Sequence, residues 1–260
     1  MRIWTVILRL HWLLSAQFGI DLIKMLRSFH GLPRYVRDLF RFRSGYTGRL
    51  NLKPCLHDWY DEGGAAKDEY FWQDLLVARK IFIANPEKHV DIGSRVDGFV
   101  AHVASFRDIE VFDIRPITAN VPGITFKQVD LMNPSMDIVN YCDSLSCLHA
   151  LEHFGLGRYG DFVDPKGYEY GIRNMALMLR PGGVFYLSLP VGVARVEFNA
   201  QRVFNPMTIM DFAESNRLLL REFAFFTSND GMVELDTAHE TLVAVGKRQY
   251  GLGIFTFIKK

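Results

Sequence analysis

Apolar runs of strand length alternate with amphipathic stretches along most of the chain after residue 85. The pattern predicts β-strands near Val90 and at 110–112, 125–129, 144–148, 184–189, 218–226 and 251–259. Helical periodicity predicts helices at 99–105, 167–179 and 208–215. Short strands that alternate with helices are typical of a parallel sheet covered on both faces. We therefore predict an α/β fold with a doubly wound, mostly parallel, seven-stranded sheet.

A further helix is predicted at 68–84, before the first strand. We expect its apolar face to hold Tyr70, Phe71, Leu75, Leu76, Ala78 and Ile81. Asn85-Pro86 ends it, because a residue before proline is disfavoured in helical conformation. Two glycines and Pro54 in residues 44–54 indicate a linker. We therefore divide the chain into an N-terminal helical appendage with its linker, residues 1–54, and an α/β domain, residues 55–260.

The first 25 residues carry apolar side chains at helical spacing. These are Trp4, Leu8, Trp12, Phe18, Leu22 and Met25, with Ser15 at the same spacing. Polar residues interrupt every stretch of about 18 apolar positions, which is the length that a membrane span requires. The segment also lacks the basic start and cleavage site of a signal peptide. An amphipathic helix is therefore expected, and it either lies on a membrane interface or packs on the body of the protein.

Charge is distributed unevenly, although the formal net charge is only +1. Residues 1–50 hold nine Lys/Arg against two acids, Asp21 and Asp38, so this head carries +7 and the remainder −6. A basic head is typical of proteins with an anionic partner, such as a membrane surface, a lipid-linked glycan or nucleic acid, and equally of a solvated helical face. The three cysteines form no CxxC pair, which favours a reducing cytoplasm. A peripheral location on the inner face of the membrane is the other expectation.

A glycine turn follows the first predicted strand, in His89-Val90-Asp91-Ile92-Gly93-Ser94. Strand, glycine turn and helix together place backbone N–H groups beside a ligand. About twenty residues later, the second strand ends in Asp113, a spacing that suits a carboxylate bound to both hydroxyls of a ribose. These two features predict a site for a nucleotide-type cofactor.

The order of these segments resembles the class I S-adenosylmethionine-dependent methyltransferases. The likeness lies in Asp91-Ile92-Gly93-Ser94, in Asp113, in Val129-Asp130-Leu131, in Leu179-Arg180-Pro181-Gly182-Gly183 and in the run from Asp143 to His153. The resemblance implies a Rossmann-like fold over residues 68–260 and S-adenosylmethionine as cofactor. It implies cofactor contacts at Asp91, Gly93, Ser94, Arg95, Asp113, Asp130 and Leu131, with Asp113 on the ribose and Asp130 on the adenine amino group.

A narrower resemblance is to the family called domain of unknown function 268. It is similar in His89–Ser94, in Asp113-Ile114-Arg115-Pro116, in the run from Glu152 to Asp161, in Leu189-Pro190-Val191-Gly192 and in Phe198-Asn199. Bacterial members accompany genes for surface polysaccharide synthesis. The resemblance therefore implies O-methylation of a saccharide or lipid-linked glycan.

One departure from the methyltransferase pattern concerns the glycine turn. Arg95 and Asp97 stand where the family has its second and third glycines, and Gly98 comes one residue late. The Arg95 side chain must turn away, bind the cofactor's carboxylate as a bidentate partner, or block the site. A blocked site would make the protein a non-catalytic scaffold of a glycan-assembly complex, and this alternative stays open.

Residues after the fourth and fifth strands are the candidates for the acceptor side, because ligands collect at the carboxyl ends of parallel strands. His149 is the expected base, since histidine exchanges a proton near neutral pH. His153 and Asp161 are further catalytic candidates, while Arg158, Tyr159, Asn199 and Arg202 are candidate sugar contacts. Structural roles for these side chains, such as folding the loop on itself, stay open as well.

Three rival functions are weaker. His149-Ala150-Leu151-Glu152-His153 matches the inverted zinc-peptidase motif HxxEH, but Gly155 and Gly157 would break the helix that this motif needs. A nicotinamide-dependent oxidoreductase lacks its GxGxxG here, and base methylation lacks an Asn/Asp-Pro-Pro motif, so nucleic acid is not the expected partner. No metal is predicted, although Asp161 and Asp164 could hold a divalent ion.

Overall fold

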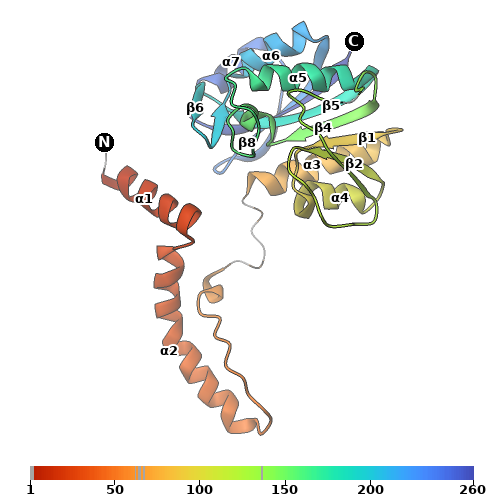
Figure 1. The fold of residues 1–260 in the computed structure, drawn as a ribbon. Coiled ribbons are helices and arrows are strands. Elements are labelled where there is room, and N and C mark those ends of the chain that lie inside the picture. The colour runs from red at the N-terminus through yellow and green to blue at the C-terminus, as the bar shows by residue number, and fades with distance from the viewer. Residues whose placement is uncertain (1–2, 62, 64–65, 67, 136) are drawn as a thin grey trace. The chain divides into compact units, whose positions relative to one another are not determined.

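The computed structural model describes residues 3–61, 63, 66, 68–135 and 137–260, with side chains from residue 10 onward (Figure 1). The chain divides into two compact units, residues 1–65 and residues 66–260. The sequence placed this boundary between residues 54 and 55.

The first unit holds two helices, α1 (Ile3–Phe18) and α2 (Leu22–Gly45), and a short 3-10 turn, η1 (Asp58–Tyr60). The expectation of one continuous helix through Met25 was wrong, because Gly19 adopts a φ of 70° and Asp21 caps a new helix by accepting from the N–H groups of Ile23 and Lys24. The side chains of Trp4 and Leu8 lie outside the described part. None of the described helices is both long and apolar enough to cross a membrane.

The second unit is built on one large sheet. Its strands are β1 (His89–Ile92), β2 (Ile109–Asp113), β3 (Ile124–Gln128), β4 (Cys142–Leu148), β5 (Leu179–Val191), β8 (Leu218–Thr227), β9 (Gly231–Leu235) and β10 (Gly251–Lys259). Their order is β3-β2-β1-β4-β5-β10-β8-β9. The first five are parallel, whereas β10 runs antiparallel to both β5 and β8. The mostly parallel α/β fold is therefore confirmed.

The prediction of seven strands was one short over the described residues, because β9 adds an edge strand antiparallel to β8. This strand is five residues long and partly exposed, so its apolar pattern is weak. A separate two-stranded ribbon, β6 (Arg195–Glu197) with β7 (Gln201–Val203), follows β5.

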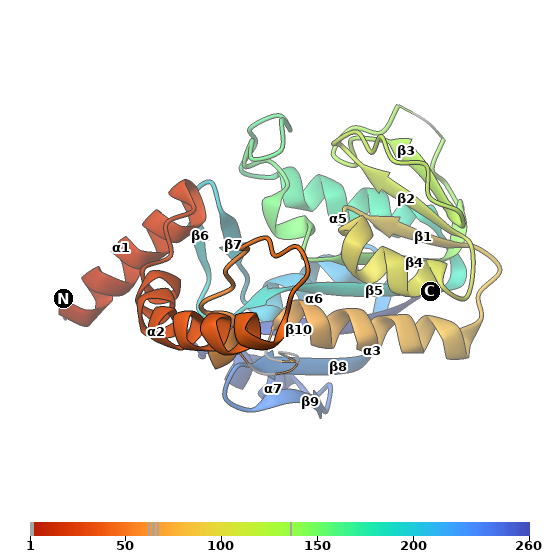
Figure 2. The same cartoon turned by 90° about the horizontal axis from the view of Figure 1, so that it is seen from below.

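Helices cover both faces of the sheet (Figures 1 and 2). One face carries α3 (Glu69–Ala84), the π-helical turn η2 (Val96–Val100) and α4 (Ala101–Ala104). The other carries α5 (Gly167–Met178), α6 (Pro206–Ser215) and α7 (His239–Gly246), while η3 (Leu151–His153) follows β4. Strand β10 is buried on both of its faces. Phe255 and Phe257 pack in the core beneath α5–α7, and Leu252 and Ile254 pack in the core beneath α3. Such a strand reads as a continuous apolar run because both of its faces are buried.

Helix α3 forms as predicted but buries a different face. Asp68 caps it through the Tyr70 N–H, and Asn85 ends it in left-handed conformation at a φ of 42°. The predicted apolar face was wrong for Tyr70, Phe71 and Leu75, which are exposed. The side chains that face the core are Gln73, Asp74, Val77, Ala78 and Ile81.

Candidate active site

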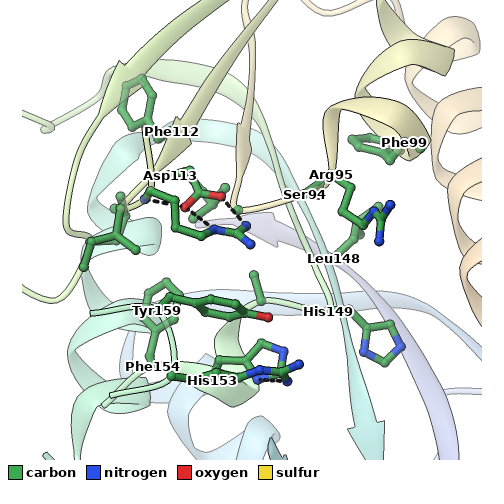
Figure 3. A pocket seen from close by; sticks show the side chains of 18 of the residues that line it. Ser94, Arg95, Phe99, Phe112, Asp113, Leu148, His149, His153, Phe154 and Tyr159 are labelled. Carbon is green, nitrogen blue, oxygen red and sulfur yellow. Dashed lines mark hydrogen bonds and ion pairs between the residues drawn. The ribbon is translucent and has the colours of Figure 1, made fainter. Parts of the chain in front are cut away.

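A cavity of about 740 Å³ lies at the carboxyl ends of the parallel strands (Figure 3). Its walls come from the turns after β1, β2, β3 and β4 and from the first turns of α3. This is where ligands bind in doubly wound sheets. Its volume lies within the range of roughly 300–1,000 Å³ that small-molecule sites occupy.

The turn after β1 is organised by a buried carboxylate. The oxygens of Asp91 accept from the Ser94 N–H at 3.0 Å, from Ser94 Oγ at 2.9 Å and from Ser146 Oγ at 2.5 Å. Burial raises the pKa of Asp91 to about 7. Asp91 does not line the cavity, whereas Gly93 and Ser94 do. The structure thus gives Asp91 the role of shaping the turn rather than of touching a ligand.

Gly93 brings the turn close to the loop after β4. Its φ is 76°, and its N–H donates to the Phe112 carbonyl at 2.8 Å. A Cβ atom here would stand only 2.8 Å from the Cβ of Ala150. Glycine alone satisfies both the backbone conformation and this approach.

Arg95 does not fill the cavity. Its side chain is 74% exposed, and its Nε and Nη2 donate to the two carboxylate oxygens of Asp97 at 2.9 and 2.6 Å. The sequence left open whether this side chain turns away, binds the cofactor's carboxylate or blocks the site. The structure shows it exposed and paired with Asp97 at the cavity wall.

Asp113 ends β2, Asp130 lies two residues after the end of β3, and both line the cavity together with Leu131. The carboxylate of Asp113 is held by Arg115, whose N–H, Nε and Nη2 donate to it at 2.8, 3.0 and 2.6 Å. A carboxylate offers about four lone-pair positions, so these three hydrogen bonds leave one free. Asp130 accepts from the Met132 N–H at 2.8 Å.

His149 directly follows β4 in a left-handed conformation, with a φ of 53°. Its Nδ1 donates to Glu152 Oε1 at 2.7 Å, and the Tyr70 ring stacks on it at 4.7 Å between centroids. Its Nε2 is buried without a hydrogen-bond partner among the described residues and lies 3.5 Å from Glu69 Oε1. Burial alone would lower the pKa of His149, but the carboxylates of Glu152 and Glu69 outweigh it and raise this pKa.

Glu152 and His153 complete a buried acid–base cluster. Glu152 is fully buried, and its Oε1 lies 3.7 Å from His153 Nε2. His153 Nδ1 donates to the Ala200 carbonyl at 2.8 Å, and burial lowers its pKa. Residues 151–153 form a single 3-10 turn. The α-helix that a zinc-peptidase HxxEH motif requires is therefore not formed here.

The glycine-rich loop after η3 is folded by Asp161. Its carboxylate accepts from the N–H groups of Gly155, Gly157 and Tyr159 at 2.7, 3.1 and 3.2 Å. Three backbone hydrogen bonds support the structural alternative for Asp161 over a catalytic one.

Tyr159 and Arg158 both line the cavity, as expected for candidate sugar contacts. The guanidinium carbon of Arg115 lies 4.3 Å from the centroid of the Tyr159 ring, and that of Arg158 lies 5.1 Å from it. Arg158 also donates to the Ala200 carbonyl at 2.8 Å. The Tyr159 ring lies below Asp113 (Figure 3), and Arg158 joins it in one wall of the cavity.

Asn199 and Arg202 do not join this site. Neither lines the cavity, and Asn199 is exposed in the turn between β6 and β7. Arg202 is buried, where its guanidinium donates to the carbonyls of Glu152, Phe154 and Pro165. The structure therefore does not bring these two candidate sugar contacts to this cavity, and Arg202 ties the loop after β4 to the ribbon.

Sequence reasoning missed the contribution of α3. Asp68, Tyr70, Gln73 and Asp74 all line the cavity. Gln73 donates to Asp74 Oδ1 at 3.1 Å and accepts from Ser188 Oγ at 2.5 Å. A signal was present in the sequence, since Gln73-Asp74 interrupts the side of the helix that carries Val77, Ala78 and Ile81. Polar residues among buried apolar positions are often functional.

Asp74 predicts a pH dependence of stability. Burial raises its pKa from 3.8 to about 6, so the folded protein keeps a proton that the unfolded chain has lost. The free energy of unfolding should therefore fall as pH rises between these values, by at most about 1.4 kcal/mol per pH unit from this group. Asp74→Asn should flatten this slope in urea unfolding at a series of pH values. Asp211→Asn, on the exposed side of α6, is the matched control, and equal slopes in the two variants would contradict the assignment.

One family model matches part of the chain. Residues 123–213 match the family described as "Caenorhabditis protein of unknown function, DUF268". This match confirms the narrower of the two resemblances for that segment. None of the curated proteins matches the chain.

Two solved structures share the fold of the second unit. The 1,6-didemethyltoxoflavin-N1-methyltransferase of Burkholderia thailandensis, solved with S-adenosylhomocysteine, aligns with 72% of this chain and 78% of its own at 14% identity, with a TM-score of 0.50. The [4+2]-cyclase SpnF aligns with 72% of this chain and 80% of its own at 13% identity, with a TM-score of 0.52. The α/β unit of this protein thus has the fold of class I S-adenosylmethionine-dependent methyltransferases, and its segment 123–213 matches DUF268.

Proposed function

We propose that this protein is an S-adenosylmethionine-dependent methyltransferase whose acceptor is a hydroxyl group of a saccharide. The observation that carries the proposal is that one cavity is lined by a glycine turn, by Asp113 and by His149, whose buried Nε2 lies 3.5 Å from Glu69 Oε1. The nitrogen, His149 Nε2, has no hydrogen-bond partner among the described residues. Buried polar atoms are nearly always paired, so an unpaired one at a cavity indicates a partner that arrives with the ligand.

The residues present fit the cofactor. Gly93 lets the turn approach Ala150 at the cavity wall, Asp113 keeps one lone-pair position for a ribose hydroxyl, and Asp130 with Leu131 offers a polar and an apolar contact for adenine. When bound, S-adenosylmethionine supplies an electrophilic methyl group on a sulfonium centre. The protein's own work is then to orient the acceptor and to take up its proton.

In this proposal His149 takes up that proton. Glu152 accepts from Nδ1, which fixes the tautomer whose Nε2 carries a free lone pair. The imidazolium that forms is stabilised by Glu152 and by Glu69, 3.5 Å from Nε2. A neutral hydroxyl needs such a base, whereas an amine acceptor carries its own lone pair, so this arrangement supports O-methylation.

The saccharide and the cytoplasmic location in this proposal rest on a resemblance, on two cavity residues and on the cysteines. The resemblance to DUF268 relatives beside polysaccharide genes suggests a saccharide or lipid-linked glycan, and Arg158 and Tyr159 supply polar and aromatic groups at the cavity. The three cysteines are unpaired, which supports a reducing compartment.

One observation supports the alternative of a non-catalytic scaffold. Arg115 already occupies most of the Asp113 carboxylate through a bidentate ion pair at 2.6 Å and 3.0 Å. A cofactor must share or displace this arginine. The solved relative named a [4+2]-cyclase is a further reason to test methyl transfer directly, because a fold does not dictate its chemistry.

Calorimetric titration of the full chain with S-adenosylmethionine and S-adenosylhomocysteine tests the proposal, with NADH as the control ligand. Micromolar binding of both sulfur ligands and none of NADH is the expected result. A folded protein that gives no heat with either sulfur ligand would exclude the enzyme and favour the scaffold.

Glu152 is predicted to act as a positioning residue for His149. Glu152→Gln removes a negative charge 2.7 Å from Nδ1, so the pKa of His149 should fall. In a plot of the methyl-transfer rate against pH, the rise that reports deprotonation of His149 should move to lower pH. The same shift should appear in an NMR titration of the His149 ring. Glu240→Gln, at the exposed start of α7, should change neither the pH–rate profile nor the NMR titration. An unchanged pH–rate profile in Glu152→Gln would contradict the positioning role of Glu152.

A further inference from the structure

Helix α2 in the first unit carries an apolar stripe along its whole length. The stripe consists of Leu22, Met25, Leu26, Phe29, Leu32, Val36 and Phe40. Steps of three and four residues place these side chains on one face. All seven are exposed, with Phe29 at 69% and Phe40 at 70%. A helix of 24 residues is about 36 Å long, so the stripe is far more extended than a scattered set of exposed apolar residues.

Basic side chains flank this stripe on one side. Arg27, Arg34, Arg37 and Arg41 follow one another at steps of seven, three and four residues. Lys24 and Arg43 add two more charges, and Asp38 is the one acid within α2. Arg27 and Arg37 form ion pairs with Asp61 and Asp38, but these pairs are largely exposed and weak. The helix therefore keeps a strong positive charge beside its apolar face.

The contacts of the first unit leave the stripe uncovered. Gly31 lies on the face opposite the stripe, where a Cβ would collide with the backbone of Leu56. Arg34 stacks on Trp59 at 3.8 Å, and Arg27 reaches Asp61. The segment after α2 thus packs along the polar side of the helix. It anchors α2 within the unit without using the apolar stripe.

We propose that α2 lies in the headgroup region of an anionic lipid bilayer, with its stripe turned toward the acyl chains. In-plane membrane helices combine this long apolar face with a basic flank, and they bury the apolar face roughly 5–10 Å deep. The arginine row then sits at the level of the lipid phosphates, where each Lys or Arg strengthens binding about fivefold. Charge complementarity selects an anionic bilayer over a neutral one. A lipid-linked acceptor would be met at this surface, although the proposal does not depend on the methyltransferase activity.

Co-sedimentation of the full chain with phosphatidylcholine vesicles, with and without phosphatidylglycerol, tests this proposal. Binding is expected to vesicles that contain phosphatidylglycerol and to weaken with added salt. Phe29→Ser with Phe40→Ser should lower partitioning at least about tenfold, because two large apolar side chains leave the interface. Arg37→Gln with Arg41→Gln should lower it by about 25-fold. Phe162→Ser, an equally exposed phenylalanine in the second unit, is the matched control and should bind as the parent does.

Several outcomes would overturn the proposal. Absence of binding to any vesicle, or binding that survives the paired phenylalanine substitution, would exclude the stripe as a lipid contact. Equal binding to neutral and anionic vesicles would exclude the role of the arginine row. Light scattering of the parent and the Phe29→Ser, Phe40→Ser protein separates a further case: a dimer that this change dissociates, without vesicle binding, would assign the stripe to a second copy of the chain. Circular dichroism of each variant checks that α2 remains helical.

Discussion

Replacing His149 by asparagine is expected to lower the rate of methyl transfer by about 10²- to 10⁴-fold, the usual contribution of a general base. Asparagine is chosen because position 149 has a φ of 53°, which asparagine tolerates better than alanine. The affinity for S-adenosylmethionine should stay near that of the parent, because the change removes proton uptake and leaves the turn after β1 intact. The measurement is the single-turnover rate with an acceptor found in a saccharide screen, together with calorimetric affinity.

Two further observations sharpen the His149 experiment. The parent rate should rise with pH as His149 loses its proton, and the variant should lack this rise. His239→Asn, at the exposed start of α7, should leave both rate and profile unchanged. A His149→Asn protein with the parent's rate would show that another group, or solvent, takes up the proton.

Asp113→Ala should weaken S-adenosylmethionine binding by about 1.5–3 kcal/mol, which is roughly tenfold to more than a hundredfold in Kd. The loss arises because the charged acceptor for a ribose hydroxyl disappears at the end of β2. Asp113→Asn, which can still accept from Arg115, tests whether the charge or only the fold of this turn matters. Calorimetry of the two variants beside the parent measures the effect.

Controls for Asp113 come from its neighbours. Asp97→Ala removes a carboxylate of the same cavity that is 70% exposed and paired with Arg95, and should cost little affinity. Arg115→Gln frees the Asp113 carboxylate; tighter binding in this variant would show that the arginine competes with the cofactor. Unchanged affinity in Asp113→Ala would remove this residue from the site.

Some parts of the candidate site could be predicted from the pattern of neighbouring residues alone. The glycine turn at 91–94 was predictable because only glycine adopts a φ of 76° readily, and Gly93 sits directly after an apolar strand. Asp113 was predictable for a related reason, since this carboxylate ends the apolar pair Val111-Phe112, whereas Asp130 follows the partly polar strand β3 by two residues. These positions depend on a few neighbouring residues and on the parallel order of the strands.

Other parts depended on contacts between distant segments. Asp91 accepts from Ser146, 55 positions away, and this partner in β4 turns the carboxylate from the cavity into the turn. Arg202 was expected at a ligand but reaches the carbonyls of the loop after β4, about 50 residues earlier. Neither partner can be identified from spacing, because the pairing of strands and the path of the loop decide which groups meet.

The amino-acid sequence by itself determined the α/β class, the succession along the chain of seven of the eight strands of the large sheet, the glycine turn and the carboxylate that ends β2. These features follow from periodicity and from backbone preferences that act over a few residues. Only the tertiary structure decided that α3 brings Asp74 and Tyr70 to the cavity, that Arg95 turns to Asp97, and that Glu152 and Glu69 enclose His149. Those results depend on which faces are buried and which side chains find partners, and burial is settled by the packing of the whole domain.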